Sequence, residues 1–127
     1  KNIAIIAGGN SSEYEVSMKS GKNIYDEVDE NGSSDLGEKY PVDKNDFSFT
    51  RNGEKILFDF AYITIHGVPG ENGLLQGYLD MMGVPYGCCN VLASALTFDK
   101  HTCNTYLKSY GVNVADSVML IRGMTYD

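Results

Sequence analysis

The sequence predicts an α/β fold built on an open, mostly parallel sheet flanked by helices. Two apolar runs, at 2–7 and 61–65, end abruptly in a glycine-containing turn, and an amphipathic segment follows each of them. Strands that alternate with helices in this way are typical of parallel sheets, in which each helix returns the chain to the next strand. The 127 residues suit one compact core.

The first unit reads as a strand, a glycine turn and a helix. The isoleucine-rich run 2–7 ends at Gly8-Gly9. Ser12 and Glu15 have the spacing of a capping box, which predicts that a helix starts there. The residues expected on the buried face of this helix recur at intervals of four, and they are Val16, Ser20, Ile24 and Val28.

The next segment, 29–57, is polar and contains only short candidate strands, at 40–42, 47–50 and 55–60. Asn52-Gly53 between the last two is a strong signal for a two-residue hairpin. A parallel sheet needs a second parallel strand after the first helix, and no long apolar run supplies it. That strand is therefore short, or residues are absent from the chain near 30–36.

The second strand–helix unit contains the clearest functional signal. The apolar run 61–65 stops at His66, and an amphipathic helix is expected from Glu71 to Met82, with Gly83 as its stop. Ligands of open α/β sheets bind beyond the carboxyl ends of the strands. His66 therefore lies where binding chemistry is expected.

Two further helices and a last strand complete the predicted order. Asn90 is expected to cap a helix over 91–98, and Asp99 to cap another over 100–110 that closes at Gly111. The apolar segment 116–122 is expected to be a strand.

Composition narrows the classes of partner. A net charge of −7 and a pI near 4.7 argue against nucleic acid or an anionic membrane as the main partner. No apolar run approaches the length of a membrane span, and the first residues enter a strand without the pattern of a signal peptide. The cysteines, Cys88, Cys89 and Cys103, lack metal-ligand spacing with other residues, so we expect reduced thiols, no zinc site and a cytoplasmic location.

Three charged or titratable residues are candidates for chemistry. Glu13 follows the first strand; it either complements the helix dipole or is a catalytic carboxylate at the cleft that holds an ammonium group or accepts a proton. His66 is either an ordinary strand-end histidine or a group that binds a carboxylate or stabilises a developing anion. Lys100 begins a helix, where a cation is locally unfavourable, so it is either a solvated lysine or a contact for an anionic ligand. The turn 8–13 lacks the glycine and lysine patterns of dinucleotide and P-loop sites.

Three segments together resemble the D-alanine–D-alanine ligases of the ATP-grasp superfamily. GGNSSEYEVSMKSG at 8–21 is similar to the family's G-G-x-S-x-E-x-x-V-S element. HGVPGENGLLQGYLDMMGVPYG at 66–87 is similar to its H-G-x-x-G-E-D-G-x-x-Q-G-x-L-E-x-x-G-x-P-Y run. VLASALTFDKHTCNTYLKSYGV at 91–112 is similar to its S-A-L-x-M-D-K segment. These segments cover about half of the chain, in the family's order.

The resemblance implies roles for four residues. Glu13 matches the acid that orients the amino group of the first D-alanine, and Val16 matches a neighbour that lines this subsite. His66 matches the histidine near the first D-alanine's carboxylate, and Lys100 matches the lysine that reaches the phosphates of ATP. The sequence departs from the family pattern elsewhere, at Asn72, Asp80 and Asn104.

The resemblance also implies a reaction and a domain division. In the family, ATP with magnesium phosphorylates one D-alanine, and a second D-alanine attacks the acyl phosphate, for peptidoglycan synthesis. Residues 1–98 would form the Rossmann-like pre-ATP-grasp substrate domain and 99–127 the start of the central domain. The adenine pocket and magnesium ligands would lie outside this chain, which alone would be inactive.

The alternatives to this reading are a D-alanine–D-lactate ligase and a non-catalytic α/β binding or dimerisation module. The family's N-terminal domain contributes to a homodimer, and an apolar stripe on the second helix could serve that contact or the core. The stripe residues are Leu74, Tyr78, Met81 and Met82.

Overall fold

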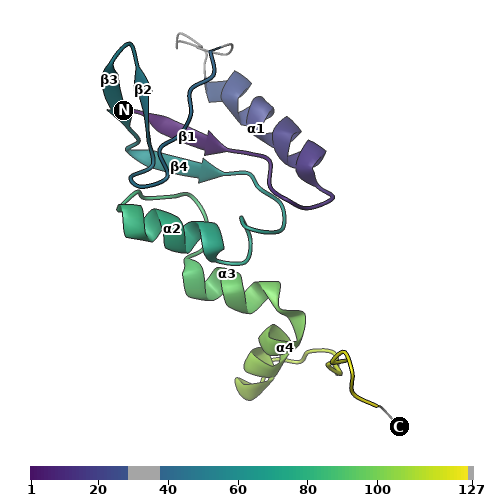
Figure 1. Cartoon of the computed structure of the whole chain (residues 1–127). Coiled ribbons are helices and arrows are strands. Elements are labelled where there is room, and N and C mark those ends of the chain that lie inside the picture. The colour runs from purple at the N-terminus through teal and green to yellow at the C-terminus, as the bar shows by residue number, and fades with distance from the viewer. Residues whose placement is uncertain (29–37, 126–127) are drawn as a thin grey trace.

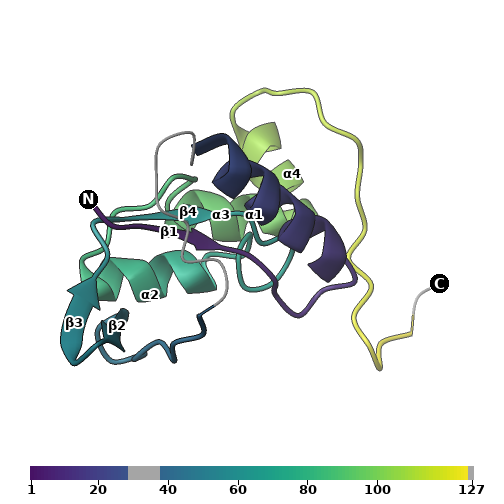
Figure 2. The same ribbon diagram turned by 90° about the horizontal axis from the view of Figure 1, so that it is seen from above.

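The fold is built around a parallel pair of neighbouring strands, β1 (Ile3–Ile6) and β4 (Phe60–Ile63). The computed structural model describes residues 1–28 and 38–125. Ile3 pairs with Phe60, and Ile6 pairs with Ile63 at the other end of the ladder. Helix α1 (Tyr14–Val28) and helix α2 (Leu74–Met82) lie on opposite sides of the strand pair (Figures 1 and 2). The expected α/β class and parallel strand pairing are confirmed.

The core lies between the strand pair and α2. Ala4 and Ala61 lie opposite each other on the two strands, and Leu79 of α2 and Val84 complete the buried cluster. Side chains along a strand alternate between the faces of a sheet, so the small residues at these positions leave room for the helix. Larger side chains pack around this cluster, among them Ile6, Ile63, Leu75, Tyr78 and Met82.

Helix α1 approaches the other face through small residues. Of the face predicted to be buried, Ser20 and Ile24 are half-buried, and the prediction is wrong for Val16. Ser17 and Gly21 are buried, whereas Val16 is 51% exposed. A Cβ atom at Gly21 would lie only 2.8 Å from the Cβ of Ala7, so this helix can approach the strand only because residue 21 has no side chain. Spacing alone favoured the larger apolar residues, but close packing selects the small ones.

The predicted hairpin is confirmed. Strand β2 (Ser48–Arg51) pairs antiparallel with β3 (Glu54–Leu57). Asn52 and Gly53 both have positive φ, 52° and 80°, which is the conformation that a two-residue type I′ turn requires. The candidate strand 40–42 is not found; Asp43 alone forms an isolated bridge with Ser48. The expected gap near 30–36 lies outside the described residues.

The capping predictions for the later helices are confirmed. Asn90 accepts a hydrogen bond from Ala93 N at 2.9 Å and begins α3 (Val91–Phe98). Asp99 accepts one from Thr102 N at 2.8 Å and begins α4 (Lys100–Ser109). Helix α2 starts three residues later than expected, because the turn around Gly70 occupies 67–73, and it ends at Gly83 as predicted.

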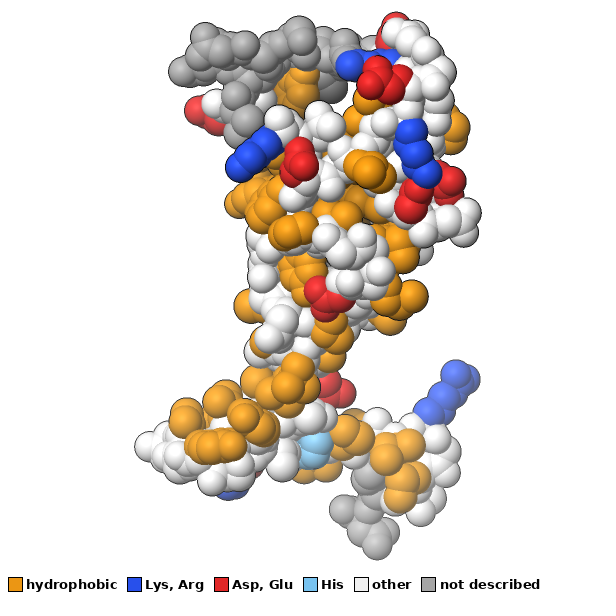
Figure 3. Space-filling model, turned by 90° about the vertical axis from the view of Figure 1, so that its left-hand side faces the viewer, with side chains coloured by type: hydrophobic (Ala, Val, Ile, Leu, Met, Phe, Trp, Pro, Cys, Tyr) orange, Lys and Arg blue, Asp and Glu red, His pale blue; other side chains and the backbone are white. Residues whose placement is uncertain are grey.

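The segment 112–125 leaves the compact part of the molecule, and the predicted strand at 116–122 is wrong. It has no strand partner among the described residues, and Val118 and Leu120 are 80% and 74% exposed. A strand needs a hydrogen-bonded neighbour, so β propensity alone cannot form one here. Figure 3 shows apolar side chains gathered over the lower part of the molecule, where α4 and this segment lie. No helix in the described ranges is long and apolar enough to cross a membrane.

Candidate functional site

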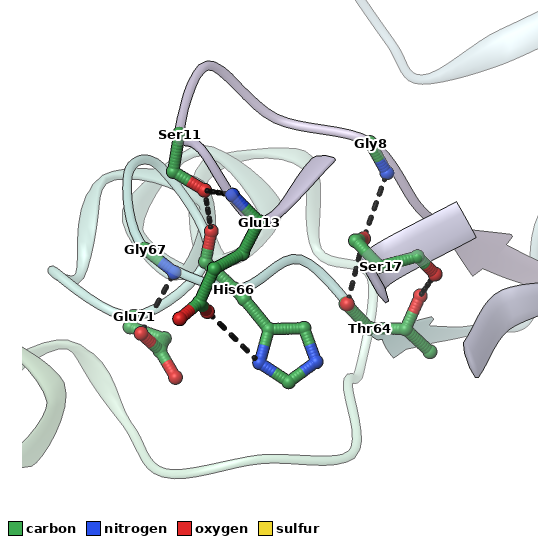
Figure 4. Close-up of polar contacts among 8 residues, drawn as sticks. All are labelled: Gly8, Ser11, Glu13, Ser17, Thr64, His66, Gly67 and Glu71. Atoms are coloured by element: carbon green, nitrogen blue, oxygen red, sulfur yellow. Dashed lines mark hydrogen bonds and ion pairs between the residues drawn. The ribbon is translucent and has the colours of Figure 1, made fainter. Parts of the chain in front are cut away.

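The structure brings Glu13 and His66 together at the carboxyl end of the strand pair. The Nδ1 atom of His66 lies 3.5 Å from Oε2 of Glu13, as Figure 4 shows. His66 follows β4, and the carbonyl of Glu13 accepts the first helical hydrogen bond of α1, from Ser17 N at 2.9 Å. The side chains are 39% and 57% exposed, so both are open to a ligand. The positions that follow β1 and β4 therefore bring these two side chains next to each other, whereas Lys100, which was expected to face the same cleft, lines a separate cavity.

Ser11 connects the two loops that carry this pair. Its hydroxyl donates a hydrogen bond to the carbonyl oxygen of His66 at 2.7 Å and accepts one from Glu13 N at 3.2 Å (Figure 4). These bonds replace the predicted capping box of Ser12 and Glu15, in which the neighbouring serine would have capped α1. Ser11 rather than Ser12 therefore satisfies the backbone N–H at the entry to the helix.

A second pair of hydrogen bonds shapes the loop after His66. Gly67 N donates to Oε2 of Glu71 at 2.7 Å, and Glu71 N donates to the carbonyl of Gly67 at 2.9 Å. Gly67 has a φ of 76°, a conformation that glycine adopts without steric cost. The two bonds close the loop on itself, so the carboxylate of Glu71 is committed to the backbone.

Beneath the site, a buried serine ties α1 to both strand ends. Ser17 is fully buried; its hydroxyl donates to the carbonyl of Thr64 at 2.7 Å and accepts from Gly8 N at 2.9 Å. Thr64 Oγ1 in turn donates to the carbonyl of Ile6 at 3.2 Å. Buried polar groups are costly unless they are bonded, so this arrangement fixes the positions of the strand ends. It holds the platform from which Glu13 and His66 project.

Lys100 lies apart from this pair, beside a cavity of about 290 Å³ between α2 and α3. Its ammonium group donates to the carbonyl of Thr97 at 3.3 Å and is exposed. Asp99 precedes it, and the hydrogen bonds from Thr102 hold the pKa of the Asp99 carboxyl below its usual range. Glu71 also lines this cavity, so the loop that follows His66 extends from the pair to the cavity beside Lys100.

Cysteine and glutamine side chains line the same cavity. The buried Gln76 donates from Nε2 to the carbonyl of Gly70 at 2.6 Å and to Sγ of Cys88 at 3.3 Å. Cys88 and Cys89 are free thiols exposed at the cavity wall. In the part of the chain that the structure describes, no group of three or more His, Cys, Asp or Glu could hold a metal ion.

The residues with predicted roles thus lie in two places, at the strand ends and at the cavity beside α3. The serines that position the strand-end residues, Ser11 and Ser17, were not predicted from the sequence. Val16 is an exposed residue on the first turn of α1, close in sequence to Glu13. Ser11 and Ser17 carried no periodic signal, because a hydroxyl on a turn or a helix face is common. The signal that could have found both is the family element G-G-x-S-x-E-x-x-V-S, in which Ser11 and Ser17 occupy the two serine positions.

Comparison with curated proteins shows extensive similarity to D-alanine–D-alanine ligases. The ligase of Phocaeicola vulgatus is 51% identical over 97% of this chain, and that of Bacteroides thetaiotaomicron is 51% identical over 98%. The chain spans 43% of each of these relatives. The first alignment extends over 138 positions, more than the 127 residues here, so the relative carries residues within the matched span that this chain lacks. No family model matches the sequence.

Solved structures of such ligases share the fold. A D-alanine–D-alanine ligase of Bacillus anthracis, complexed with ATP, matches 99% of this chain and 42% of its own with a TM-score of 0.72 and 29% identity. The ligase of Aeromonas hydrophila matches 98% of this chain and 52% of its own with a TM-score of 0.81, at 23% identity. The VanG D-Ala:D-Ser ligase of Enterococcus faecalis has a TM-score of 0.77 and 28% identity over 96% of this chain and 45% of its own. The chain belongs to the D-alanine–D-alanine ligase family and corresponds to the N-terminal part of its members.

Proposed function

We propose that the intact protein joins two D-alanine molecules in an ATP-dependent reaction, and that this chain supplies the subsite for the first of them. The observation that carries the proposal is the 3.5 Å approach of Glu13 and His66 at the carboxyl end of the strands, in a chain 51% identical to such ligases. The joined D-alanines would serve peptidoglycan precursor synthesis.

The chemistry of the pair suits a zwitterionic amino acid. The carboxylate of Glu13 would hold the ammonium group of the first D-alanine, at the N-terminal end of α1, where a negative charge is favoured. The imidazole of His66 would donate a hydrogen bond to the substrate carboxylate. This contact would steady the anion while its oxygen is phosphorylated. Val16, exposed on the same turn, would line the subsite.

Lys100 fits a contact with a phosphate, which is where ATP would meet this chain. It is the cation at the wall of the 290 Å³ cavity, and it is bonded through one backbone carbonyl, so it can turn toward an anion. ATP would supply the transferred phosphoryl group and magnesium would neutralise its charge. The magnesium ligands and the adenine pocket would lie mainly outside this chain, which spans 43% of the length of its relatives.

A homodimer and a cytoplasmic location are parts of the same proposal. The apolar stripe proposed for a dimer contact divides in the structure. Leu74 and Met81 are 62% and 80% exposed, while Tyr78 and Met82 pack against the core. The exposed pair is thus the part of α2 that could meet another subunit. We also propose that residues 1–98 form the substrate domain and that the central domain begins at residue 99.

The proposal is tested on the intact parent protein. Purified enzyme is incubated with ATP, magnesium and D-alanine, and ADP release and dipeptide are measured together. We expect ADP to form only when D-alanine is present, in a one-to-one ratio with dipeptide. An enzyme that forms neither product would disprove the proposal.

The same assay distinguishes the second candidate, a ligase with a different acceptor. The structural similarity to a D-Ala:D-Ser ligase, at a TM-score of 0.77, is the observation that supports this second candidate. D-Lactate and D-serine are offered against D-alanine in competition. We expect D-alanine to be the preferred acceptor, and a preference for D-lactate would support the depsipeptide ligase instead. Sedimentation of a protein inactive with every acceptor would then test the dimerisation module.

A further inference from the structure

The hydroxyl of Ser11 is the one side-chain group that, among the described residues, bonds to the backbone of both Glu13 and His66. It donates to the carbonyl oxygen of His66 at 2.7 Å and accepts from the N–H of Glu13 at 3.2 Å. The serine is half-buried, and both its donor and one of its acceptor sites are used. A single side chain therefore joins two loops that are 55 residues apart in the sequence.

Other contacts bring the same loops together. Asn10 N donates to the carbonyl of Val68 at 3.3 Å. A Cβ atom placed on Gly67 would lie 3.0 Å from the Cβ of Ser11, so the two loops touch at this point. Figure 4 shows Ser11 above the pair, with its hydroxyl between the backbones of the two residues.

The side chains of the pair are not held by the core, which makes the backbone contacts decisive. Glu13 and His66 are 57% and 39% exposed, and their mutual contact is at 3.5 Å, longer than a short charge-assisted hydrogen bond. Their separation is therefore set mainly by where the two backbones lie. The two hydrogen bonds of the Ser11 hydroxyl, one within its own loop and one to the other loop, act directly on the peptide groups of Glu13 and His66.

We propose that Ser11 is a positioning residue for the first amino-acid subsite, and that its hydroxyl sets the spacing between the Glu13 carboxylate and the His66 imidazole. This inference rests on the function proposed above. A ligand with an ammonium and a carboxylate on one carbon needs its two contacts at a fixed separation. Misplacement of binding groups by about 1 Å can cost on the order of 100-fold in rate, so a residue that fixes this separation affects binding without touching the substrate.

Ser12 offers a matched control. It is the next residue, it is exposed, and it makes no hydrogen bond within the ranges that the structure describes. Ser12→Ala removes the same hydroxyl group from the same turn without altering either contact. A change seen with Ser11→Ala and absent with Ser12→Ala therefore reports the contacts of Ser11.

The test uses the intact parent enzyme and three variants, Ser11→Ala, Ser11→Thr and Ser12→Ala. Initial rates are measured against D-alanine and against ATP, and the two D-alanine KM values are fitted separately. For Ser11→Ala we expect the first-subsite KM to rise about 10-fold, because both hydrogen bonds that set the spacing of the pair are lost, while KM for ATP changes less than twofold. Ser11→Thr keeps the hydroxyl and should restore most of the affinity.

Thermal unfolding of each variant separates positioning from folding. Ser11→Ala could raise the KM for D-alanine only because the domain is destabilised. In that case KM for ATP will rise as well and the melting temperature will fall, and the proposal is wrong. Equal effects of Ser11→Ala and Ser12→Ala would also overturn it. A wild-type enzyme without ligase activity contradicts the proposed function, whereas an active wild type with an unaffected Ser11→Ala contradicts the positioning role alone.

Discussion

The Glu13–His66 pair and the Lys100 cavity are built in different ways. The pair stands on a platform of hydrogen bonds that link β1, β4 and α1, with the buried Ser17 bonded at both its donor and its acceptor site. Lys100 is the exposed first residue of α4. The one hydrogen bond described for its ammonium group is to the carbonyl of Thr97. One half of the candidate site is preorganised within this chain, while the other half is free to adjust.

This difference matches what the two halves are proposed to bind. A small amino acid offers few contacts, so the residues that recognise it gain from being fixed before it arrives. A phosphate group is larger and diffusely charged, and a lysine on a flexible stem can follow it. The comparison predicts that changes at the pair act on D-alanine and changes at the cavity act on ATP.

The largest expected effect is that of Glu13→Gln in the intact enzyme. Loss of the carboxylate should lower kcat/KM for the first D-alanine on the order of 100-fold, since a preorganised charged group is removed from the subsite. KM for ATP should change little. Glu15→Gln, in the same exposed first turn of α1, is the control and should leave the rates near those of the wild type. Unchanged kinetics in Glu13→Gln would exclude the role proposed for this residue.

The second prediction compares two helical glycines. Gly21→Ala places a Cβ 2.8 Å from the Cβ of Ala7, so α1 must shift from the strands, and we expect a loss of about 1–3 kcal/mol in the free energy of unfolding. Gly77→Ala meets only Val91 at 3.9 Å and should stabilise α2 by roughly 0.5–1 kcal/mol. Guanidinium denaturation measures both. Equal effects would show that α1 is not closely docked.

The third prediction concerns Lys100→Met. We expect KM for ATP to rise about 10-fold because one charge-assisted contact with a phosphate is lost. The first-subsite KM for D-alanine should remain within twofold. Lys108→Met is the control on the same helix; it breaks an exposed ion pair with Asp116 at 2.8 Å, and we expect no kinetic change. An increase in the D-alanine KM alone would reverse the proposed division of the site.

The smallest effect is expected from the cap of α4. Hydrogen bonds from Thr102 lower the pKa of Asp99, so the stabilisation from its carboxylate is present above the ordinary aspartate value and is lost as the pH falls through the lower pKa of the folded state. Far-UV circular dichroism between about pH 2 and pH 6 follows the helix content. Asp99→Asn keeps a capping oxygen and should remove this contribution to the pH dependence, and a retained acid transition of unchanged size would contradict the assignment.

The sequence predicted most of the local structure but not the packing of α1. The hairpin at Asn52-Gly53 and the caps at Asn90 and Asp99 depend on residue chemistry within a few positions, and the structure shows all three. The contact of α1 with the strands depends on the absence of a side chain at Gly21, which apolar periodicity cannot register. The expected strand at 116–122 failed for a related reason, since pairing requires a partner.

In the candidate site, too, the features that follow from local sequence were predicted and the long-range contacts were not. Parallel strands place their carboxyl ends at one edge, so the positions after β1 and β4 could be expected to meet, and Glu13 and His66 do. The groups that hold them were not predicted. Ser11 acts through contacts with a loop 55 positions away, and no local pattern indicates such a partner.

The parallel pairing of β1 with β4 has a consequence for synthesis of the chain. β1 leaves the ribosome before its partner β4, which begins at Phe60, so this pairing must wait while the intervening residues are made. The β2–β3 hairpin needs only its own neighbours and can form during this interval. A nascent chain that stalls before residue 60 would display an apolar, hydrogen-bonding strand edge, which is the kind of surface that chaperones bind and that aggregates when left uncovered.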